Sequence, residues 1–281
     1  MEITVKNFDI AQICESGQCF RMSRIEKTKV KESDELTDVY EIIAADKYVT
    51  ATQHGNVVSF NCSEEHYNNF WKAYFDIETD YGKIISKIDK KDTYLCNAAD
   101  FGSGIRILKQ DLWEMIISFI ISQRNNIKRI RKCIKLLCEK YGEEKCVNGY
   151  KYYTFPTPEA LFNANIEDIR ALGLGYRDTY IKKTAESIYK LETNLSEIAE
   201  MSYLEAKEEL LKLCGVGEKV ADCICLFALH HLDAFPKDTH INKVLDEQYK
   251  QGFPFDKYKG FAGILQQYIF FYDLNGKMNN K

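Results

Sequence analysis

The sequence predicts an α+β protein in which an N-terminal antiparallel β-sheet with helices precedes a mostly α-helical domain. Two observations predict this fold class. Strand-like runs gather before residue 98, whereas helical periodicity dominates from residue 112 onward, where the few prolines and glycines fall between elements. A chain of 281 residues is long for one domain and comfortable for two. We therefore expect an α/β domain over residues 1–98 and a helical domain over residues 99–281.

The elements of the first domain follow from local patterns. Residues 39–45 and 48–52 are strand-like. Residues 54–56 are typical of a turn, and a third strand-like run follows at 57–62. A serine followed by two glutamates then favours a helix start, so we expect a helix over residues 63–74.

In the second domain, a glycine hairpin joins two predicted helices. Ser202 and Glu205 fit a capping box at the start of the first helix. Gly215 and Gly217 end that helix, because glycine reaches positive φ without a Cβ clash. A second helix is predicted over residues 219–229, and the exposed amides at its start can hold a phosphate. A glycine-capped turn in any α-helical domain would have the same pattern.

Lys219 and Asp238 are the candidate catalytic residues. Lys219 lies in the first turn of the second helix, where the helix dipole and burial both disfavour its protonated form. An amine whose pKa is lowered toward neutrality can attack an electrophilic carbon and form a Schiff base. Asp238 lies where a helix over residues 239–250 would begin, and capping that helix is one role for its carboxylate. The other role is to stabilise positive charge developing on a sugar ring.

Six motifs, in the same order along almost the whole chain, carry a resemblance to a known family. They lie at residues 16–21, 101–111, 118–127, 172–177, 213–223 together with 236–240, and 262–270. The glycine hairpin followed by Pro-x-Asp-x-His resembles the helix-hairpin-helix–Gly/Pro/Asp superfamily of DNA glycosylases. Within it, the chain is similar to the 8-oxoguanine DNA glycosylase/AP lyase family.

The resemblance implies a pocket for a base flipped out of duplex DNA, because a base inside a duplex is out of reach. Cys223 and Phe270 match the residues that sandwich the lesion, and Gln266 matches the glutamine that reads its Watson–Crick edge. Gly17 matches the glycine whose carbonyl accepts the N7 proton that 8-oxoguanine has and guanine lacks. Phe227 is expected in the same pocket. Without the resemblance, Cys223 and Phe270 would be taken as core residues and Gly17 as part of a turn.

The resemblance also implies contacts with the DNA around the flipped nucleotide. Arg129 and Arg177 match the arginines that bind the hydrogen-bond acceptors of the cytosine opposite the flipped base. Tyr176 matches the aromatic side chain beside the gap that the flipped base leaves in the stack. Arg124 replaces the family's gap-filling asparagine, and we expect this longer, charged side chain to weaken the preference for the opposite base. The remaining expected contacts are at helix starts, in the hairpin and at a phosphate: Asn125, Asn126, Gly215, Gly217 and His240.

The charge of the chain favours a local binding surface over bulk attraction to DNA. A net charge of −4 and a pI near 5.8 argue against binding by overall charge. One run of twelve residues, 124–135, nevertheless contains six cationic side chains and no acid. These are Arg124, Lys128, Arg129, Arg131, Lys132 and Lys135. We expect this run to contact phosphates and bases, although a solvated helix face is the alternative.

The cysteines indicate a reduced protein without a metal cluster. None of the ten is spaced as Cys-x-x-Cys, and none follows Cys225, where the related endonuclease III-like glycosylases carry an iron–sulfur loop. No signal peptide and no apolar run of the ~20 residues that a membrane span needs is found. We expect a cytoplasmic monomer, nucleoid-associated in a prokaryote, with no required cofactor and no iron–sulfur cluster. The hairpin could hold one monovalent or calcium ion through the carbonyls of Leu211, Leu213 and Val216, although no carboxylate cluster marks such a site.

The predicted function is that of a bifunctional DNA glycosylase/AP lyase that excises 8-oxoguanine from duplex DNA in base excision repair. Lys219 would attack C1′ and form a Schiff base, Asp238 would stabilise the charged sugar, and β-elimination would nick the strand. One alternative is a monofunctional glycosylase for alkylated bases, a class that keeps the aspartate and lacks the lysine. The other is a non-catalytic helix-hairpin-helix DNA-binding protein, which has no need for Lys219, Asp238 and a base pocket together.

Overall fold

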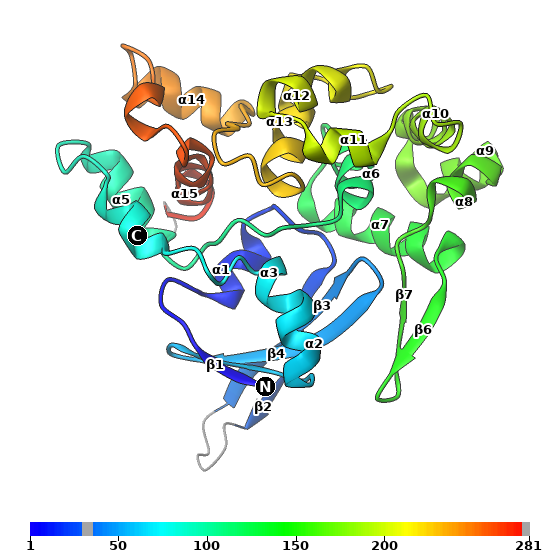
Figure 1. Cartoon of the computed structure of the whole chain (residues 1–281), viewed down its shortest axis with the longest axis horizontal. Helices are drawn as coiled ribbons and strands as arrows, with labels where there is room; N and C mark the ends of the chain where they lie inside the picture. Colours follow the sequence, from blue (N-terminus) through cyan, green and yellow to red (C-terminus); the bar gives the residue numbers. More distant parts are fainter. Residues whose placement is uncertain (30–35, 277–281) are drawn as a thin grey trace.

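The computed structural model describes residues 1–29 and 36–276, and its N-terminal part contains an antiparallel β-sheet (Figure 1). Five strands pair in the order β1-β5-β4-β3-β2, and every pair is antiparallel. The strands are β1 (Glu2–Thr4), β2 (Met22–Lys29), β3 (Leu36–Ala44), β4 (Lys47–His54) and β5 (Val57–Phe60). Strands β2 to β5 form a meander, and the N-terminal strand β1 completes the sheet beside β5.

Three of these strands confirm the sequence prediction. β3, β4 and β5 overlap the three predicted runs, and Gly55, with φ +56, lies in the turn between β4 and β5. β1 and β2 were not predicted. β1 has only three residues, and β2 is mostly polar with a register shift between Arg24 and Glu26, so neither has a clear alternating apolar pattern.

Short helices pack on the sheet and build its hydrophobic core. They are α1 (Ile10–Glu15), α2 (Glu64–His66), the π-helix η1 (Tyr67–Trp71) and α3 (Lys72–Tyr74). Ser63 caps α2 by accepting the N–H of His66, as its position predicts. Trp71 and Phe75 are fully buried in one cluster with strand residues such as Ile42 and Val58.

The rest of the described chain is mostly helical, and from residue 112 onward the periodicity predicts this. Its α-helices are α4 (Tyr81–Ser86), α5 (Thr93–Phe101), α6 (Leu112–Ser122), α7 (Ile127–Tyr141), α8 (Pro158–Asn163), α9 (Ile166–Ile169), α10 (Arg177–Tyr189), α11 (Leu195–Glu200), α12 (Tyr203–Leu211), α13 (Glu218–Phe227), α14 (Thr239–Gln248) and α15 (Ala262–Asn275). A π-helical segment, η2 (Arg170–Leu174), and a 3-10 turn, η3 (Phe255–Tyr258), complete the set.

A β-hairpin interrupts this helical part and corrects the prediction of an almost wholly helical segment. β6 (Glu144–Val147) pairs with β7 (Tyr150–Tyr153) around Asn148 and Gly149, whose φ angles are +50 and +84. Asn-Gly is the dipeptide that two-residue hairpin turns favour, so the signal was present in the sequence. The Tyr152 hydroxyl donates to the carbonyl of Asp46, which fastens the hairpin to the N-terminal sheet.

Two central helices bring distant parts of the chain together. In α13, every residue from 220 to 227 is buried. In α15, residues 262–269 are buried, and the rings of Phe101 from α5 and Phe271 from α15 lie 5.4 Å apart. The C-terminal helix therefore returns to α5 (Figure 1). The predicted boundary after residue 98 falls within α5, and the division into domains stays a prediction. Over the described residues, no helix has both the length and the apolar character that crossing a membrane requires.

Candidate active site and nucleic-acid interface

The predicted helix–hairpin–helix unit is formed by α12, the glycine turn and α13. The Ser202–Glu205 capping box starts α12, with the Ser202 N–H 3.0 Å from the Glu205 carboxylate. Gly215 has φ +84, and a Cβ at this position would collide with the ring of Tyr180. Gly217 is the N-cap of α13. The hairpin therefore needs a glycine at position 215 for two separate reasons, its backbone angle and its packing.

Lys219 lies in the first turn of α13. Its ammonium nitrogen is 5.4 Å from the centre of the Phe119 ring. Cys223 follows one turn later and is buried. Burial raises the pKa of the Cys223 thiol, and the Lys219 ammonium opposes that rise through its charge and a hydrogen bond. The amine and the thiol therefore share one local environment.

Asp238 is the N-cap of α14, as its sequence position predicts. Its carboxylate accepts the N–H of Ile241 at 2.8 Å, which fixes the side chain at the start of the helix. Asp238 lines a small pocket together with Lys219. The structure therefore brings the two candidate catalytic residues to one site from two different helices.

This pocket has a volume of about 40 Å³, and every predicted base-pocket residue lines it. Those residues are Gly17, Cys223, Phe227, Gln266 and Phe270, and the other lining residues besides Lys219 and Asp238 are Ser16, Phe119, Pro236 and Gln267. The rings of Phe119 and Phe227 stack with their centres 5.6 Å apart, which gives the pocket an aromatic wall.

Two adjacent glutamines of α15 present unpartnered oxygens. Gln266 donates from Nε2 to the carbonyl of Pro236 at 3.0 Å, while its Oε1 is buried and accepts no hydrogen bond. Gln267 also lines the pocket, and its Oε1 is likewise buried without a partner. A buried acceptor without a donor is unfavourable, so both oxygens are suited to a ligand that carries N–H groups. Gln267 was not among the predicted residues, although it lies inside the motif at residues 262–270.

Gly17 is held in place by the residue that follows it. Its φ is +77, and the nearest Phe270 ring atom lies 3.4 Å from where a Cβ would stand. The Gln18 amide donates to the Ser16 hydroxyl and the Arg106 carbonyl, both at 2.9 Å, and accepts the N–H of Leu108 at 2.8 Å. The pocket wall at Gly17 is thereby bound to the segment that leads into α6. Sequence reasoning did not single out Gln18, because its partners Arg106 and Leu108 lie about 90 residues further along the chain.

A larger groove of about 870 Å³ opens onto the pocket. Pocket and groove share Gly17, Phe119, Lys219, Asp238 and Phe270. Five of the predicted DNA contacts line the groove, namely Arg124, Asn125, Asn126, Gly217 and His240. The side chain of Asn126 caps α7 by accepting the N–H of Arg129 at 2.9 Å.

Four other predicted DNA contacts do not line the groove. Gly215 lies in the hairpin turn. Arg129 is exposed and donates to the carbonyl of Gly173 at 2.9 Å. Tyr176 is also exposed, at the start of α10. Arg177, in contrast, is only 4% exposed, and its guanidinium donates to backbone carbonyls of Gln123, Arg124 and Leu174. The proposed base-reading role of Arg177 stays a prediction, and it requires exchange of these bonds.

Of the six cations in the predicted basic run, only Arg124 lines the groove, and two others pair with acids of the protein itself. Arg131 is 3.5 Å from the carboxylate of Glu15 and donates to the carbonyl of Cys14 at 2.6 Å. Lys135 lies 3.8 Å from Glu139 on its own helix.

His240 faces both the groove and an acid. Its Nδ1 lies 3.0 Å from a carboxylate oxygen of Asp273, whose side chain is buried. The imidazole is thereby oriented at the start of α14.

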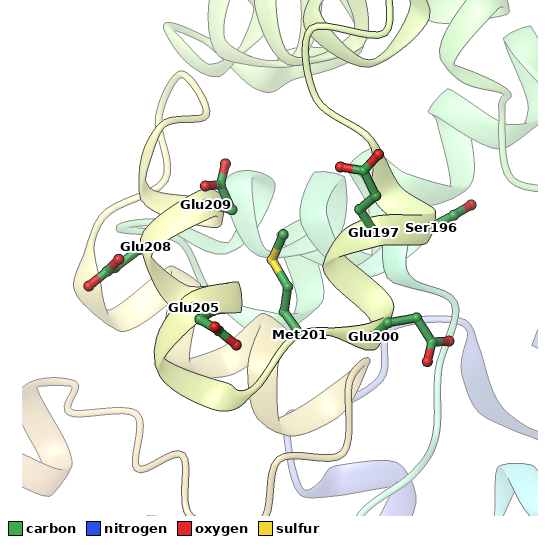
Figure 2. A pocket seen from close by; sticks show the side chains of 7 residues that line it. All are labelled: Ser196, Glu197, Glu200, Met201, Glu205, Glu208 and Glu209. Carbon is green, nitrogen blue, oxygen red and sulfur yellow. The ribbon is translucent and has the colours of Figure 1, made fainter.

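A separate hollow of about 680 Å³ lies between α11 and α12 (Figure 2). Its lining consists of Ser196, Glu197, Glu200, Met201, Glu205, Glu208 and Glu209. None of these residues lines the groove. Carboxylates repel phosphates, so DNA is expected in the groove and not in this hollow.

The described residues contain no group of three or more His, Cys, Asp or Glu side chains that could hold a metal ion. Two carbonyls near the hairpin turn already accept hydrogen bonds, that of Leu213 from the Val216 N–H and that of Cys214 from the Thr184 hydroxyl, both at 3.1 Å.

Two family models match consecutive parts of the chain. The model described as 8-oxoguanine DNA glycosylase, N-terminal domain, matches residues 1–116. The model described as HhH-GPD superfamily base excision DNA repair protein matches residues 117–251.

Curated and solved relatives agree with these models. The N-glycosylase/DNA lyase of Saccharomyces cerevisiae is 38% identical over 159 residues, which cover 52% of this chain and 42% of that protein. The chain spans about half the length of the first curated relatives that it matches. The solved 8-oxoguanine glycosylase/lyase of Clostridium acetobutylicum, in complex with double-stranded DNA containing cytosine opposite 8-oxoguanine, is 38% identical with a TM-score of 0.87. That match covers 99% of this chain and 94% of the other.

A more distant structure shares only the fold. The 3-methyladenine DNA glycosylase of Archaeoglobus fulgidus matches with a TM-score of 0.71 at 20% identity, over 99% of each chain.

Proposed function

The chain belongs to the 8-oxoguanine DNA glycosylase family of the HhH-GPD superfamily, and from this membership we propose that it excises 8-oxoguanine from duplex DNA and cleaves the strand at the resulting abasic site. The observation that carries the proposal is the small pocket shared by Lys219, Asp238 and the buried acceptor of Gln266. An amine nucleophile, a carboxylate and a base-reading amide meet there at the end of a groove.

The flipped base is expected to enter through the groove. Phe270 lines both pocket and groove, which supports a stacking role opposite Cys223. The Gln266 oxygen would accept N–H groups of the purine edge. The Gly17 carbonyl would accept the N7 proton of 8-oxoguanine, whereas guanine would leave that carbonyl facing a lone pair. About 40 Å³ has room for only a few waters, so the pocket must widen when a base enters.

The chemistry would proceed at C1′ of the damaged nucleotide. The amine of Lys219 forms a bond to C1′ while the bond to the base breaks, and the leaving base takes up the proton that the attacking nitrogen loses. Positive charge that develops on the sugar is stabilised by the Asp238 carboxylate. Opening of the sugar ring gives a Schiff base between Lys219 and C1′. Loss of a proton from C2′ then expels the 3′ phosphate and cleaves the strand.

The decisive experiment is reductive trapping with borohydride on a duplex containing 8-oxoguanine opposite cytosine. The wild-type protein should form a covalent complex, because borohydride reduces the Schiff base. Lys219→Gln should give neither base release nor nicking nor trapping, while it still binds the lesion duplex through the hairpin amides. Trapping by Lys219→Gln at the wild-type level would remove Lys219 from the nucleophile role.

A monofunctional glycosylase for alkylated bases is the second candidate, because the Archaeoglobus structure has the same fold. Lys219 argues against it, since hydrolytic excision needs no amine. Duplexes that carry 3-methyladenine distinguish the two candidates, and faster release of 3-methyladenine than of 8-oxoguanine would favour the second.

Two finer expectations complete the proposal. A cytoplasmic, nucleoid-associated location would suit an enzyme that acts on duplex DNA. A hairpin-bound cation at the carbonyls of Leu211, Leu213 and Val216 would compete with the internal hydrogen bond that Leu213 already accepts. If a cation binds there, a monovalent cation or calcium should raise DNA affinity at constant ionic strength, and magnesium should not.

A further inference from the structure

Gln123 connects two parts of the proposed DNA interface that are far apart in sequence. It follows α6 directly, and its side-chain Nε2 donates to the carbonyl of Gly215 in the hairpin at 2.8 Å. The same nitrogen lies 3.3 Å from the carbonyl of Ile120 in its own helix. Gln123 therefore joins the hairpin to the loop of residues 123–126, which we call the wedge loop because it carries Arg124 at the family's gap-filling position.

Arg177 holds the wedge loop from its other side. Its Nε and Nη2 both donate to the backbone carbonyl of Gln123, the first at 3.0 Å, and Nη2 also lies 3.3 Å from the carbonyl of Arg124. Its Nη1 donates to Leu174 at 3.0 Å. Because the guanidinium is buried, these bonds are shielded from water and hold the backbone of the loop at a fixed position.

The helix that carries Arg177 also packs against the hairpin. The ring of Tyr180 in α10 lies against Gly215, and the hydroxyl of Thr184 donates to the carbonyl of Cys214 at 3.1 Å. The wedge loop, the first turns of α10 and the hairpin thus form one connected unit, in which Gln123 supplies the direct bond between loop and hairpin.

The backbone of the wedge loop needs this support. Arg124 has φ +47, a left-handed conformation that non-glycine residues adopt at a cost of about 1 kcal/mol or more. Its side chain is exposed and lines the groove. A strained residue that points at the proposed substrate persists only where the surrounding structure determines its conformation.

We propose that Gln123 is a positioning residue that sets the distance between the wedge at Arg124 and the phosphate-binding amides of the hairpin. Duplex DNA has a fixed geometry, so a protein that grips a phosphate with one segment and fills the gap with another must hold the two in register. Without the bond to Gly215, the wedge loop can shift relative to the hairpin, and extrusion of a paired base becomes slower. This inference rests on the proposed glycosylase function.

The test compares substrates that need base extrusion with substrates that do not. Single-turnover rates are measured for 8-oxoguanine in a paired duplex, for 8-oxoguanine in a bubble of mismatches, and for strand cleavage at a preformed abasic site. Gln123→Met keeps the size of the side chain without the donor, and Gln123→Ala removes both. The control is Gln12→Met, which removes two side-chain bonds to the backbone at a site outside the groove: Gln12 donates to the carbonyl of Phe101 at 3.1 Å and accepts the N–H of Gly104 at 3.0 Å.

Both Gln123 variants should release 8-oxoguanine from the paired duplex about fivefold to tenfold more slowly, as expected for one lost hydrogen bond. Release from the bubble and cleavage at the abasic site should stay within about twofold of the wild type, because unpaired nucleotides need little extrusion. Gln12→Met should match the wild type on all three substrates. Thermal unfolding checks that each variant is folded, and the half-buried position of Gln123 predicts that it is.

Two results would overturn the inference. If Gln123→Met matches the wild type on the paired duplex, the hydrogen bond to Gly215 has no role in extrusion. If the Gln123 variants slow all three reactions equally, the residue supports the fold or the chemistry and does not position the wedge. Failure of the wild-type protein itself to release 8-oxoguanine from any substrate would instead overturn the proposed function, so the two failures are distinguishable.

Discussion

Gly215 is a residue at which the hairpin tolerates no side chain. Gly215→Ala must place a Cβ at φ +84 against the ring of Tyr180, so we expect the free energy of unfolding to fall by roughly 1–3 kcal/mol and DNA affinity to fall with it. Gly217→Ala is the control, because φ is −105 there and a Cβ meets open space. Urea unfolding of the two variants measures the difference, and equal losses would contradict this reading of the turn.

Phe270 and Phe271 are neighbours with separate expected roles. Phe270 is half-buried and lines the pocket, whereas Phe271 is buried against Phe101. Phe270→Ala should weaken lesion binding by roughly 1–3 kcal/mol through lost stacking and change the unfolding free energy little. Phe271→Ala should lower the unfolding free energy by roughly 3–5 kcal/mol because it leaves a cavity. Binding isotherms on lesion duplex and urea unfolding check both, and the reverse pattern would contradict the pocket assignment.

At the scale of elements, the two arginines proposed to read the opposite base differ in how they are held. Arg129 is exposed and donates from Nη2 to the carbonyl of Gly173, whereas the buried Arg177 donates to the backbone of the wedge loop. Arg129→Ala should therefore reduce the difference in excision rate between cytosine and the other opposite bases. One well-made base contact accounts for about 1–3 kcal/mol of that discrimination, and Tm should not change. Arg177→Ala should lower Tm as well. Both effects are checked by excision rates opposite each of the four bases and by thermal unfolding. If the order of the four rates is unchanged in Arg129→Ala, Arg129 does not recognise the opposite base.

The elements also show which features sequence reasoning could reach. The capping box at Ser202, the cap at Asp238 and the glycine turn were predictable because each depends on residues within a few positions. The bond between Gln123 and Gly215 spans 92 residues, and no local pattern marks it. The β6–β7 hairpin is different, because its Asn148-Gly149 turn was a local signal. The prediction gave more weight to the helical periodicity on both sides of this turn.

At the scale of the whole molecule, buried Asp76 joins the N-terminal part to the end of the α13 segment. Its carboxylate accepts hydrogen bonds from Thr79 and Tyr81, lies 3.0 Å from Lys109 and lies 3.4 Å from His230. Burial alone would raise the pKa of Asp76, but the hydrogen bonds and charges of His230 and Lys109 outweigh burial and hold this pKa at about 2.

Because the folded pKa of Asp76 is depressed, its contribution to stability is present above the unfolded pKa of about 4 and is lost as the pH falls toward 2. Asp76→Asn should therefore lower the unfolding free energy by about 2 kcal/mol at pH 7. The difference from the wild type should shrink between pH 4 and pH 2. Urea unfolding at pH 7, 4 and 2.5 measures this, and a difference that does not depend on pH would show that the charge of Asp76 is unimportant.

The carboxylate-lined hollow between α11 and α12 has a consequence for how the protein meets DNA. The groove is lined by the cations Arg124, Lys219 and Lys237 beside the acids Glu218 and Asp238, whereas the hollow is lined by five glutamates and no cation, so the two surfaces differ in charge. Near a duplex at low salt, the torque on such a molecule turns the groove toward the phosphates before contact. Encounters in the wrong orientation therefore separate quickly, and those that persist begin with the pocket already facing the bases. This preference for one orientation weakens as added salt screens the charges of both surfaces.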